Sequence, residues 1–358
     1  MPARLSPTAQ KLFRTVPNLG LAEAQNTDVR LFLEQCTRAT IEEALTEFSA
    51  RICYNSVKRI GSAPTFVEGI LRSGHLSTLE HGSLLIKMPI QHLEERKWFR
   101  EAVQTNRYFD MFGGNLAGNM RSWLEYVSNT KETLFSSMIM ALLPSAFAAG
   151  TYLPPESLYE FVEQAPVNVP SFESGTPNVY LLGVNRGTLD YKLGKVDDRI
   201  TREWGRFVFL IEGVSRSLTH QFVRHRGFSF SQESQRYVDF EKGQVGKTYP
   251  PFVFPEGLTD EQGNALFAAY RADVEQYENL RKLGLKKEDA RFILPNAAST
   301  RLVASASVRE LSHFLNIRCA KDAQWEIRRM AREMAKLAYM AAPFDQLEKV
   351  MAAHDIEL

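Results

Sequence analysis

The sequence predicts an α+β fold. Two short apolar runs, Leu84–Met88 and Phe207–Ile211, have the length and composition of β-strands. Other segments repeat their apolar residues with helical spacing, and the longest such stripe is Leu266, Tyr270, Val274, Tyr277 and Leu280, ended by Gly284. Neither strand is followed by a Gly-x-Gly-x-x-Gly sequence, so a Rossmann fold is not expected.

The length and composition limit the number of domains and the kinds of partner that we expect. The chain has 358 residues, of which 44% are hydrophobic, enough for one large domain or two average ones. Its 43 basic and 42 acidic residues give a formal net charge of +1. A general binder of nucleic acids or membrane surfaces would carry a basic excess. We therefore expect neither a nucleic-acid nor a membrane partner.

The three cysteines indicate a reducing compartment. Cys36, Cys53 and Cys319 are scattered, without a Cys-x-x-Cys pair or a spacing typical of metal ligands. This pattern is typical of buried thiols rather than of a disulfide framework. The Met1–Arg4 start shows no signal peptide, and no apolar run is long enough to span a bilayer. We expect a soluble, cytoplasmic protein without a bound metal.

Residues 1–36 show no clear pattern of secondary structure. The first clear elements after them are two helices. Thr40, followed three residues later by Glu43, forms a capping-box pattern, and this helix is expected to close at Arg51–Tyr54. A second helix is expected from Pro64 to a C-terminal cap at Gly74. Both precede the first strand.

A histidine-containing stretch, Gly74–His81, lies between the second helix and the first strand. It reads Gly-His-Leu-Ser-Thr-Leu-Glu-His. Taken alone, His75 and His81 are more typical of hydrogen-bonded structural histidines than of ligands. Their spacing is also poor for a metal site, so zinc is not predicted.

The stretch with the most reactive side chains runs from Ser215 to Val238. It contains five serines, with the arginines and histidines Arg216, His220, Arg224, His225, Arg226 and Arg236. Guanidinium groups match the geometry of phosphates and carboxylates. The cluster therefore predicts a site for a phosphorylated, ring-bearing ligand. The alternative interpretation is a solvated, charged loop.

Four motifs resemble those of one enzyme family. Arg224-His225-Arg226-x-x-Ser229-x-x-x-x-Ser234-x-Arg236 resembles the RHRxxSxxxxSxR signature of the flavin-dependent thymidylate synthases, the ThyX family. The other three similarities are Gly74–His81 to the GHxSxxEH motif, Ala290–Asn296 to the ARxxLPxN element, and Ala323–Arg328 to the AQWEIR helix, which we expect to continue until Pro343. The resemblance covers roughly residues 36–88 and 207–340.

The resemblance implies a fold and a domain arrangement. Residues 36–88 and 207–340 would form a catalytic domain, with a central mixed or antiparallel sheet flanked by long helices. In the family, the strand after GHxSxxEH typically runs almost directly into the Arg-rich segment. Residues 91–206 are therefore expected to be an insertion, mainly helical at first and loop-rich later, with a linker at Ala165–Pro177. Residues 1–35 and 341–358 would be terminal segments.

The resemblance also implies an activity. Family members methylate deoxyuridine monophosphate (dUMP) to dTMP, with methylenetetrahydrofolate as carbon donor and reduced FAD as hydride source. NADPH is the reductant. In such an enzyme the cofactor performs the hard chemistry, while the protein supplies orientation and charge. The expected partners are thus small molecules, and the expected assembly is a homotetramer with sites built from several subunits.

Site residues follow from the resemblance position by position. Arg318 is the expected catalytic residue, stabilising the uracil ring as its N3 proton is lost, because a guanidinium stays charged. The residues expected to bind flavin are Ser77, Arg224, His225, Arg226, Gln232, Arg309 and His313. Those expected to bind the nucleotide are Gln221, Arg224, Gln232, Glu233, Ser234, Gln235, Arg236, Arg291 and Arg318. Without this context, Arg309 and Arg318 could equally be partners in surface ion pairs.

The sequence leaves two alternatives to this function. Ser234 could be a nucleophile activated by His225, but a serine needs a base and an oxyanion hole, and no Gly-x-Ser-x-Gly elbow is present. A nucleophilic cysteine signature is absent as well. The non-enzymatic alternative is a nucleotide- or RNA-binding module that uses the Arg-rich loop, which the charge balance disfavours. A flavin spectrum of the purified protein would discriminate between them.

The insertion contains a short sequence that resembles a family element missing from its usual place. The family usually carries a flavin-contacting Asn-x-Arg ahead of the AQWEIR helix, where this chain has Ser307-Val308-Arg309. The insertion contains Asn119-Met120-Arg121, which is more similar to the family element. Asn119 and Arg121 could replace the missing contacts, since asparagine offers both a donor and an acceptor. The alternative is that Asn119 simply caps a helix.

Overall fold

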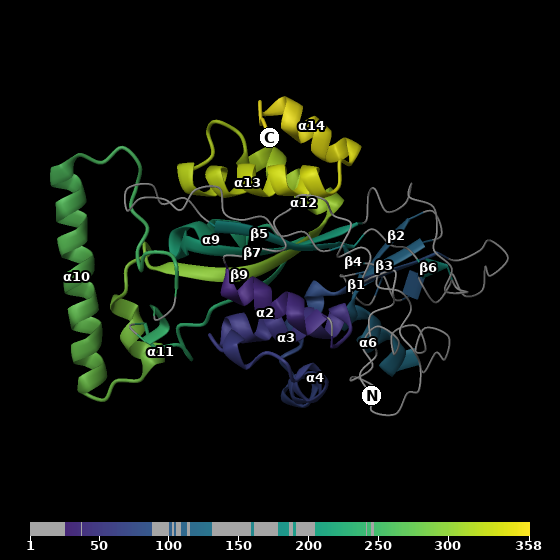
Figure 1. Cartoon of the computed structure of the whole chain (residues 1–358), viewed down its shortest axis with the longest axis horizontal. Helices are drawn as coiled ribbons and strands as arrows, with labels where there is room; N and C mark the ends of the chain where they lie inside the picture. The colour runs from purple at the N-terminus through teal and green to yellow at the C-terminus, as the bar shows by residue number, and fades with distance from the viewer. Residues whose placement is uncertain are drawn as a thin grey trace.

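The α+β class is confirmed. The computed structural model describes residues 26–36, 38–87, 100–101, 104, 109–112, 115–130, 159–160, 178–185, 189–190, 205–240, 242–244 and 247–358. At its centre is an antiparallel sheet with the strand order β4-β5-β7-β9-β8 (Figure 1). Its strands are β4 (Tyr159–Glu160), β5 (Asn178–Asn185), β7 (Arg206–Ser215), β8 (Ser229–Gln232) and β9 (Ser299–Ser307).

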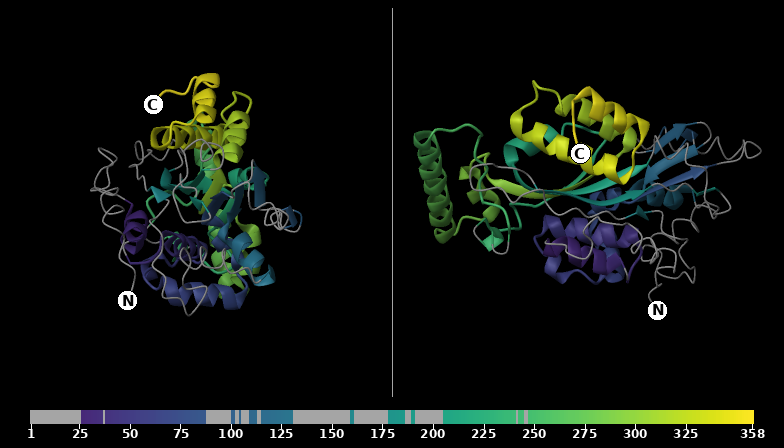
Figure 2. Two further views of the ribbon diagram at one scale, coloured as in Figure 1. Left: turned by 90° about the vertical axis from the view of Figure 1, so that its right-hand side faces the viewer. Right: turned by 45° about the horizontal axis from the view of Figure 1, so that its top comes forward.

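Helices cover both faces of this sheet, which explains the nearly continuous apolar sequence of β7. On one face lie α2 (Thr27–Cys36) and α3 (Ile41–Cys53); on the other lie α12 (Val308–Arg318), α13 (Trp325–Ala341) and α14 (Asp345–Ala353) (Figures 1 and 2). Successive strand residues point to opposite faces. Phe207 and Phe209 therefore pack in the cluster with α12–α14, whereas Val208 and Leu210 pack with α2 and α3.

The predicted helix boundaries agree with the structure. The Thr40 side chain accepts a hydrogen bond from the amide of Glu43 at the start of α3. Helix α4 (Ala63–Ser73) ends at Gly74, whose φ of 70° is left-handed and therefore favours glycine. Pro343 follows the end of α13, because a proline cannot continue a helix.

The predicted long amphipathic helix is α10 (Asp260–Lys282), which stands at one end of the molecule (Figure 1). Its buried Tyr270 and Tyr277 pack in a separate small core with Phe240 and Phe252. The short elements α11 (Lys287–Ala290) and η6 (Arg291–Ile293) follow it and lead into β9. The ARxxLPxN-like stretch is thereby brought to the end of the sheet where β9 begins.

A second, mixed sheet lies beside the first and has the order β2-β3-β1-β6. Its strands are β1 (Ser83–Lys87), β2 (Phe109–Phe112), β3 (Asn115–Asn119) and β6 (Leu189–Asp190). Helix α6 (Met120–Thr130) follows β3, and the 3₁₀ helix η3 (Leu76–His81) precedes β1. The remaining elements are η2 (Val57–Arg59), α9 (Arg216–Phe222) and η5 (Lys242–Gln244).

The structure adds strands and helices that the sequence did not predict. Strand β5 lies within residues 91–206, yet it pairs with β7 in the central sheet, from Asn178↔Glu212 to Asn185↔Arg206. The described part of residues 91–206 also contains the helix α6 and the short strands β2, β3, β4 and β6. Helices α2 and α14 lie in the expected terminal segments and pack against the core. The expected linker at Ala165–Pro177 lies outside the described residues, and the division into domains stays a prediction.

Among the residues that the structure describes, no helix combines the length and the apolar character that a membrane span requires.

Candidate functional site

The Arg-rich motif extends along β8, at the edge of the described central sheet. His225 precedes this strand and Glu233 follows it, while β8 itself pairs with β9 from Ser229↔Ser305 to Gln232↔Leu302. Three residue steps along a strand span roughly 10 Å. The two halves of the motif are therefore separated, and each half forms its own cluster.

At the first end of β8, His225 contacts helix α12. The Nε of Arg318 donates a hydrogen bond of 3.0 Å to Nε2 of His225, and the imidazole lies edge-on to Phe314 with ring centroids 4.9 Å apart. Burial, together with the positive charges of Arg318 and His313, lowers the pKa of His225 to about 4. His225 is thus neutral near neutral pH, with its proton on Nδ1 because Nε2 accepts.

Three exposed arginines lie on the two segments that carry this pair. Arg224, Arg226 and Arg309 are exposed, and His313 lies one turn beyond Arg309 on α12. Within the described part of the chain, no carboxylate forms an ion pair with any of the three arginines. Such an arrangement of free N–H donors fits the pyrophosphate of a flavin dinucleotide.

At the second end of β8, two predicted nucleotide-binding arginines converge on one residue. Arg236 Nε lies 3.3 Å from the carboxylate of Glu288, and Arg291 Nε donates to the backbone carbonyl of Glu288 at 3.1 Å. Arg236 also lies over the ring of Tyr237, 5.3 Å from its centroid. The arrangement leaves Arg236 exposed and able to exchange a weak surface ion pair for a phosphate.

Neighbouring polar groups order this second end. Gln232 Nε2 donates to Thr219 Oγ1 at 3.1 Å, which ties β8 to α9. Arg216, at the start of α9, donates to the backbone carbonyl of Glu233 at 2.6 Å. Burial, with Arg291 nearby, lowers the pKa of Arg216 to about 10. Its Nε is buried, and none of the described residues forms a hydrogen bond with it. Ser234 accepts a hydrogen bond from the amide of Arg236 at 3.2 Å.

The histidine-containing element lies on the other face of the sheet. His81 is buried, and its Nδ1 and Nε2 form hydrogen bonds to Ser305 Oγ (3.0 Å) and Ser231 Oγ (2.9 Å). Burial and the charge of Arg206 lower the pKa of His81 to about 3. His81 is therefore a neutral structural residue that fastens η3 to β8 and β9. Ser77 lies half-buried in the same 3₁₀ helix.

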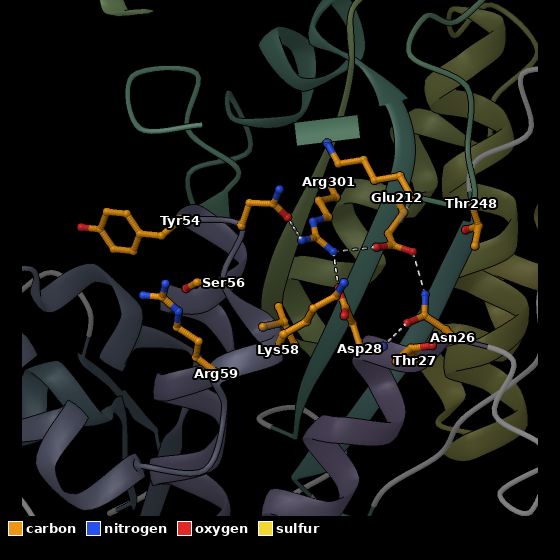
Figure 3. A pocket seen from close by; sticks show the side chains of 13 residues that line it. Asn26, Thr27, Asp28, Tyr54, Ser56, Lys58, Arg59, Glu212, Thr248 and Arg301 are labelled. Atoms are coloured by element: carbon orange, nitrogen blue, oxygen red, sulfur yellow. Dashed lines mark hydrogen bonds and ion pairs between the residues drawn. The ribbon is translucent and has the colours of Figure 1, made fainter. Parts of the chain in front are cut away.

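A polar pocket of about 500 Å³ contains none of the predicted site residues (Figure 3). At its base Arg301 forms ion pairs with Asp28 and with Glu212 at 3.3 Å, and donates to Asn55 Oδ1 at 2.6 Å. Asn26 donates to Glu212 at 2.7 Å. The signal that could have revealed this cluster is a charge inside each of two apolar strands, β7 and β9, because buried charges need partners.

Glu233 belongs to this charge cluster rather than to an open nucleotide site. Its buried carboxylate accepts from Lys247 at 2.6 Å and from Arg301 at 3.1 Å. The side chain is thus already engaged inside the protein. The expectation from the sequence that Glu233 takes part in nucleotide binding stays a prediction.

Asn119 caps a helix, as the simpler of the two sequence interpretations predicts. Its Oδ1 accepts from the amide of Ser122 at 2.9 Å, and only 4% of the residue is exposed. Ser307 caps α12 in the same way through the amide of Glu310. Both residues end a strand and begin a helix. Asn119 therefore presents no open surface to a ligand, whereas Arg121 is half-buried beside η3.

The chain resembles known proteins in sequence. A family described as "Thymidylate synthase complementing protein" matches residues 182–344. Flavin-dependent thymidylate synthases from Geobacter sulfurreducens and Pyrococcus furiosus are 43% and 40% identical over 141 and 142 residues, which is 39% and 37% of this chain. The chain spans 60% and 56% of these relatives. A third, from Haloarcula marismortui, is 36% identical over 172 residues, 42% of this chain and 70% of the relative.

Proposed function

Because the chain belongs to the family of flavin-dependent thymidylate synthases, we propose that it methylates the uracil of dUMP at carbon 5. The observation that carries this proposal is the arrangement of the motif residues. Arg318 and His225 meet at one end of β8, and Arg236 and Arg291 meet at the other. Each pair joins residues that are far apart in the chain and that the motifs assign to one reaction.

The first end of β8 is the proposed flavin site. Arg224, Arg226, Arg309 and His313 would hold the FAD, since their exposed N–H donors suit its phosphates. When bound and reduced by NADPH, this cofactor supplies the hydride that completes the transferred methyl group. The neutral His225 would accept or donate hydrogen bonds there without adding a second charge beside Arg318.

Arg318 is the proposed catalytic residue. Its Nε–H is used by His225, and among the described residues none takes up its terminal nitrogens within hydrogen-bond distance. These nitrogens can therefore face the pyrimidine. A fixed positive charge there would stabilise the negative charge that develops on the ring as its N3 proton is lost. His225 fixes the plane of the guanidinium, which favours one orientation toward the ring.

The second end of β8 is the proposed nucleotide-binding end. Arg236 and Arg291 would bind the phosphate of dUMP, and Ser234, Gln235, Gln221 and Gln232 would supply neutral hydrogen bonds. Glu233 would act here only through its backbone, because its carboxylate is held by Lys247 and Arg301. Methylenetetrahydrofolate is the proposed carbon donor.

The separation of the two ends supports a shared site. A single nucleotide and a flavin ring must be in contact to react, yet the two clusters lie at opposite ends of β8, roughly 10 Å apart. We propose that another copy of the chain brings the complementary end, as in a homotetramer. Arg224, Arg226 and Tyr237 are exposed and available for such an arrangement. The cytoplasmic location expected from the sequence stays a prediction.

The decisive test is made on the purified chain. We expect a flavin absorption spectrum that bleaches with NADPH, and formation of dTMP from dUMP only when methylenetetrahydrofolate is also present. Omitting each component in turn provides the controls. A colourless protein that forms no dTMP with added FAD, but binds RNA, would replace the enzyme with the non-catalytic alternative. Light scattering on the same sample tests the tetramer.

A further inference from the structure

Helix α6, in the segment that separates the two motif regions, is fastened to η3 and β1. The amide of Met120 donates to the carbonyl of Gly82 at 3.0 Å. The indole of Trp123, which is fully buried, donates to the carbonyl of Leu84 at 3.0 Å. A Cβ added at Gly82 would lie only 2.8 Å from the Met120 side chain, so the contact is close. The start of α6 is therefore fixed relative to the residues that follow η3.

From this fixed start, Arg121 reaches back to η3. Its Nη1 forms an ion pair with Glu80 Oε1 at 2.9 Å, and its Nε pairs with Glu125 Oε1 at 2.8 Å, one turn along α6. The Glu80 side chain is only 10% exposed, whereas that of Glu125 is 38% exposed. The contact with Glu80 is thus the more buried of the two, and the loss of its charged partner would leave a largely buried carboxylate unpaired.

The central sheet also forms hydrogen bonds with η3. Arg206 Nη2 donates to the backbone carbonyl of Glu80 at 3.0 Å and to Ser229 Oγ at 2.9 Å. His81 adds its two bonds to Ser231 and Ser305. The main chain of η3 is consequently fixed to β8 and β9, while the Glu80 side chain is fixed by α6.

Glu80 and Ser77 are coupled by the geometry of their helix. In a 3₁₀ helix, side chains three residues apart are eclipsed and lie on the same face. Ser77 and Glu80 stand in this relation within η3. A change in the position of Glu80 would therefore be transmitted to the face that presents Ser77.

We propose that Arg121 is a positioning residue for the flavin site: by holding Glu80, it sets the orientation in which η3 presents Ser77. The segment containing α6 thereby contributes to the site without touching the cofactor. This inference rests on the proposed function and on the flavin contact that the family motif implies for Ser77. It replaces the idea that Asn119 contacts the ligand, because Asn119 is used to cap α6.

The test compares Arg121→Met with two other variants of the full chain. Arg121→Lys keeps a positive charge for Glu80, and Glu125→Gln removes only the exposed partner. Hydrogen exchange of the amides of residues 75–82 is measured without flavin, and the Kd for added FAD is measured by fluorescence quenching. In Arg121→Met we expect faster exchange confined to these amides and a Kd that rises roughly fivefold, the effect of losing one partly buried ion pair.

The two remaining variants make the result specific. Arg121→Lys should restore most of the protection and affinity, and Glu125→Gln should match the wild type in both. If Arg121→Met does not fold, Arg121→Gln carries the same expectation. Unchanged exchange at residues 75–82, or faster exchange with an unchanged Kd, overturns the proposal.

The experiment distinguishes a failure of the proposed function from a failure of the role proposed for Arg121. A wild-type chain that binds no FAD refutes the proposed function and, with it, the role in the flavin site. The exchange measurement does not use flavin, so it still decides whether Arg121 orders η3.

Discussion

The Nε of Arg318 donates a 3.0 Å hydrogen bond to Nε2 of His225, a residue 93 positions earlier in the chain. The bond joins the end of α12 to the turn before β8. It requires His225 to be neutral and protonated on Nδ1. The burial that lowers the pKa of His225 therefore also preserves the orientation of the arginine.

Replacing Arg318 by alanine should abolish most methylation while leaving the fold and the flavin content largely intact. Loss of a charge-stabilising group from a closed site typically costs on the order of 3 kcal/mol, or roughly a hundredfold in turnover. Steady-state dTMP formation and the flavin spectrum measure the two effects separately. Arg332, which donates to the carbonyls of His354 and Asp355, provides a control, and Arg332→Ala should keep wild-type turnover. Near wild-type turnover in Arg318→Ala would refute the assignment.

Replacing Ser234 by alanine should preserve measurable methylation. The Ser234 hydroxyl accepts a hydrogen bond from the amide of Arg236, and His225 is engaged with Arg318 at the other end of β8. A nucleophilic serine needs a base within hydrogen-bond reach. We expect a higher KM for dUMP and no covalent nucleotide adduct in the wild type. Mass spectrometry of the quenched reaction checks this, and a uridylate adduct mapped to Ser234 would show that the serine is a nucleophile after all.

Acid should destabilise the protein through His81. Its pKa falls from 6.5 in an exposed environment to about 3 in the folded state, so the unfolded chain binds an extra proton between these values. The free energy of unfolding should therefore decrease as the pH drops below about 6.5, by up to about 1.4 kcal/mol per pH unit for this group. His225, whose pKa is lowered to about 4, contributes in the same direction.

The measurement is urea unfolding of the wild type and His81→Gln at several pH values between about 7 and about 4. Carboxylates titrate in both proteins, so the difference between the two slopes isolates His81. The variant should be less stable near neutral pH and less sensitive to acid. Equal slopes would mean that His81 does not resist protonation in the folded state.

Replacing Arg301 by methionine should destabilise the fold strongly. Arg301 is buried and forms ion pairs with Asp28, Glu212 and Glu233. Without it, Glu233 would keep its ion pair with Lys247, whereas Asp28 and Glu212 would lose the ion pair that they form with Arg301. Removing one partner of a buried ion pair typically costs about 3–5 kcal/mol. The free energy of unfolding in urea gives the value.

The matched control for this change is Arg72→Met. Arg72 pairs with Glu68 at 3.2 Å on the surface of α4, and its side chain is 82% exposed. Such pairs contribute at most about 1 kcal/mol. Similar losses in the two variants would indicate that the Arg301 cluster is hydrated rather than buried.

The sequence by itself determined the local structure and the family. Thr40, Gly74 and Pro343 act on their immediate neighbours, so the ends of α3, α4 and α13 could be predicted from them. The spacing from Arg224 to Arg236 is fixed along the chain, and it was sufficient to identify the motif. The same local rules predicted that Asn119 could cap a helix.

Only the tertiary structure decided which of these residues meet. Strand pairing places Arg318 on His225, and Arg236 and Arg291 on Glu288, whereas it turns the carboxylate of Glu233 inward to Lys247 and Arg301. It also recruits β5 from the expected insertion into the central sheet and sets Arg121 against Glu80. These outcomes depend on the register of distant strands and on the need of each buried charge for a partner, neither of which is contained in a local pattern.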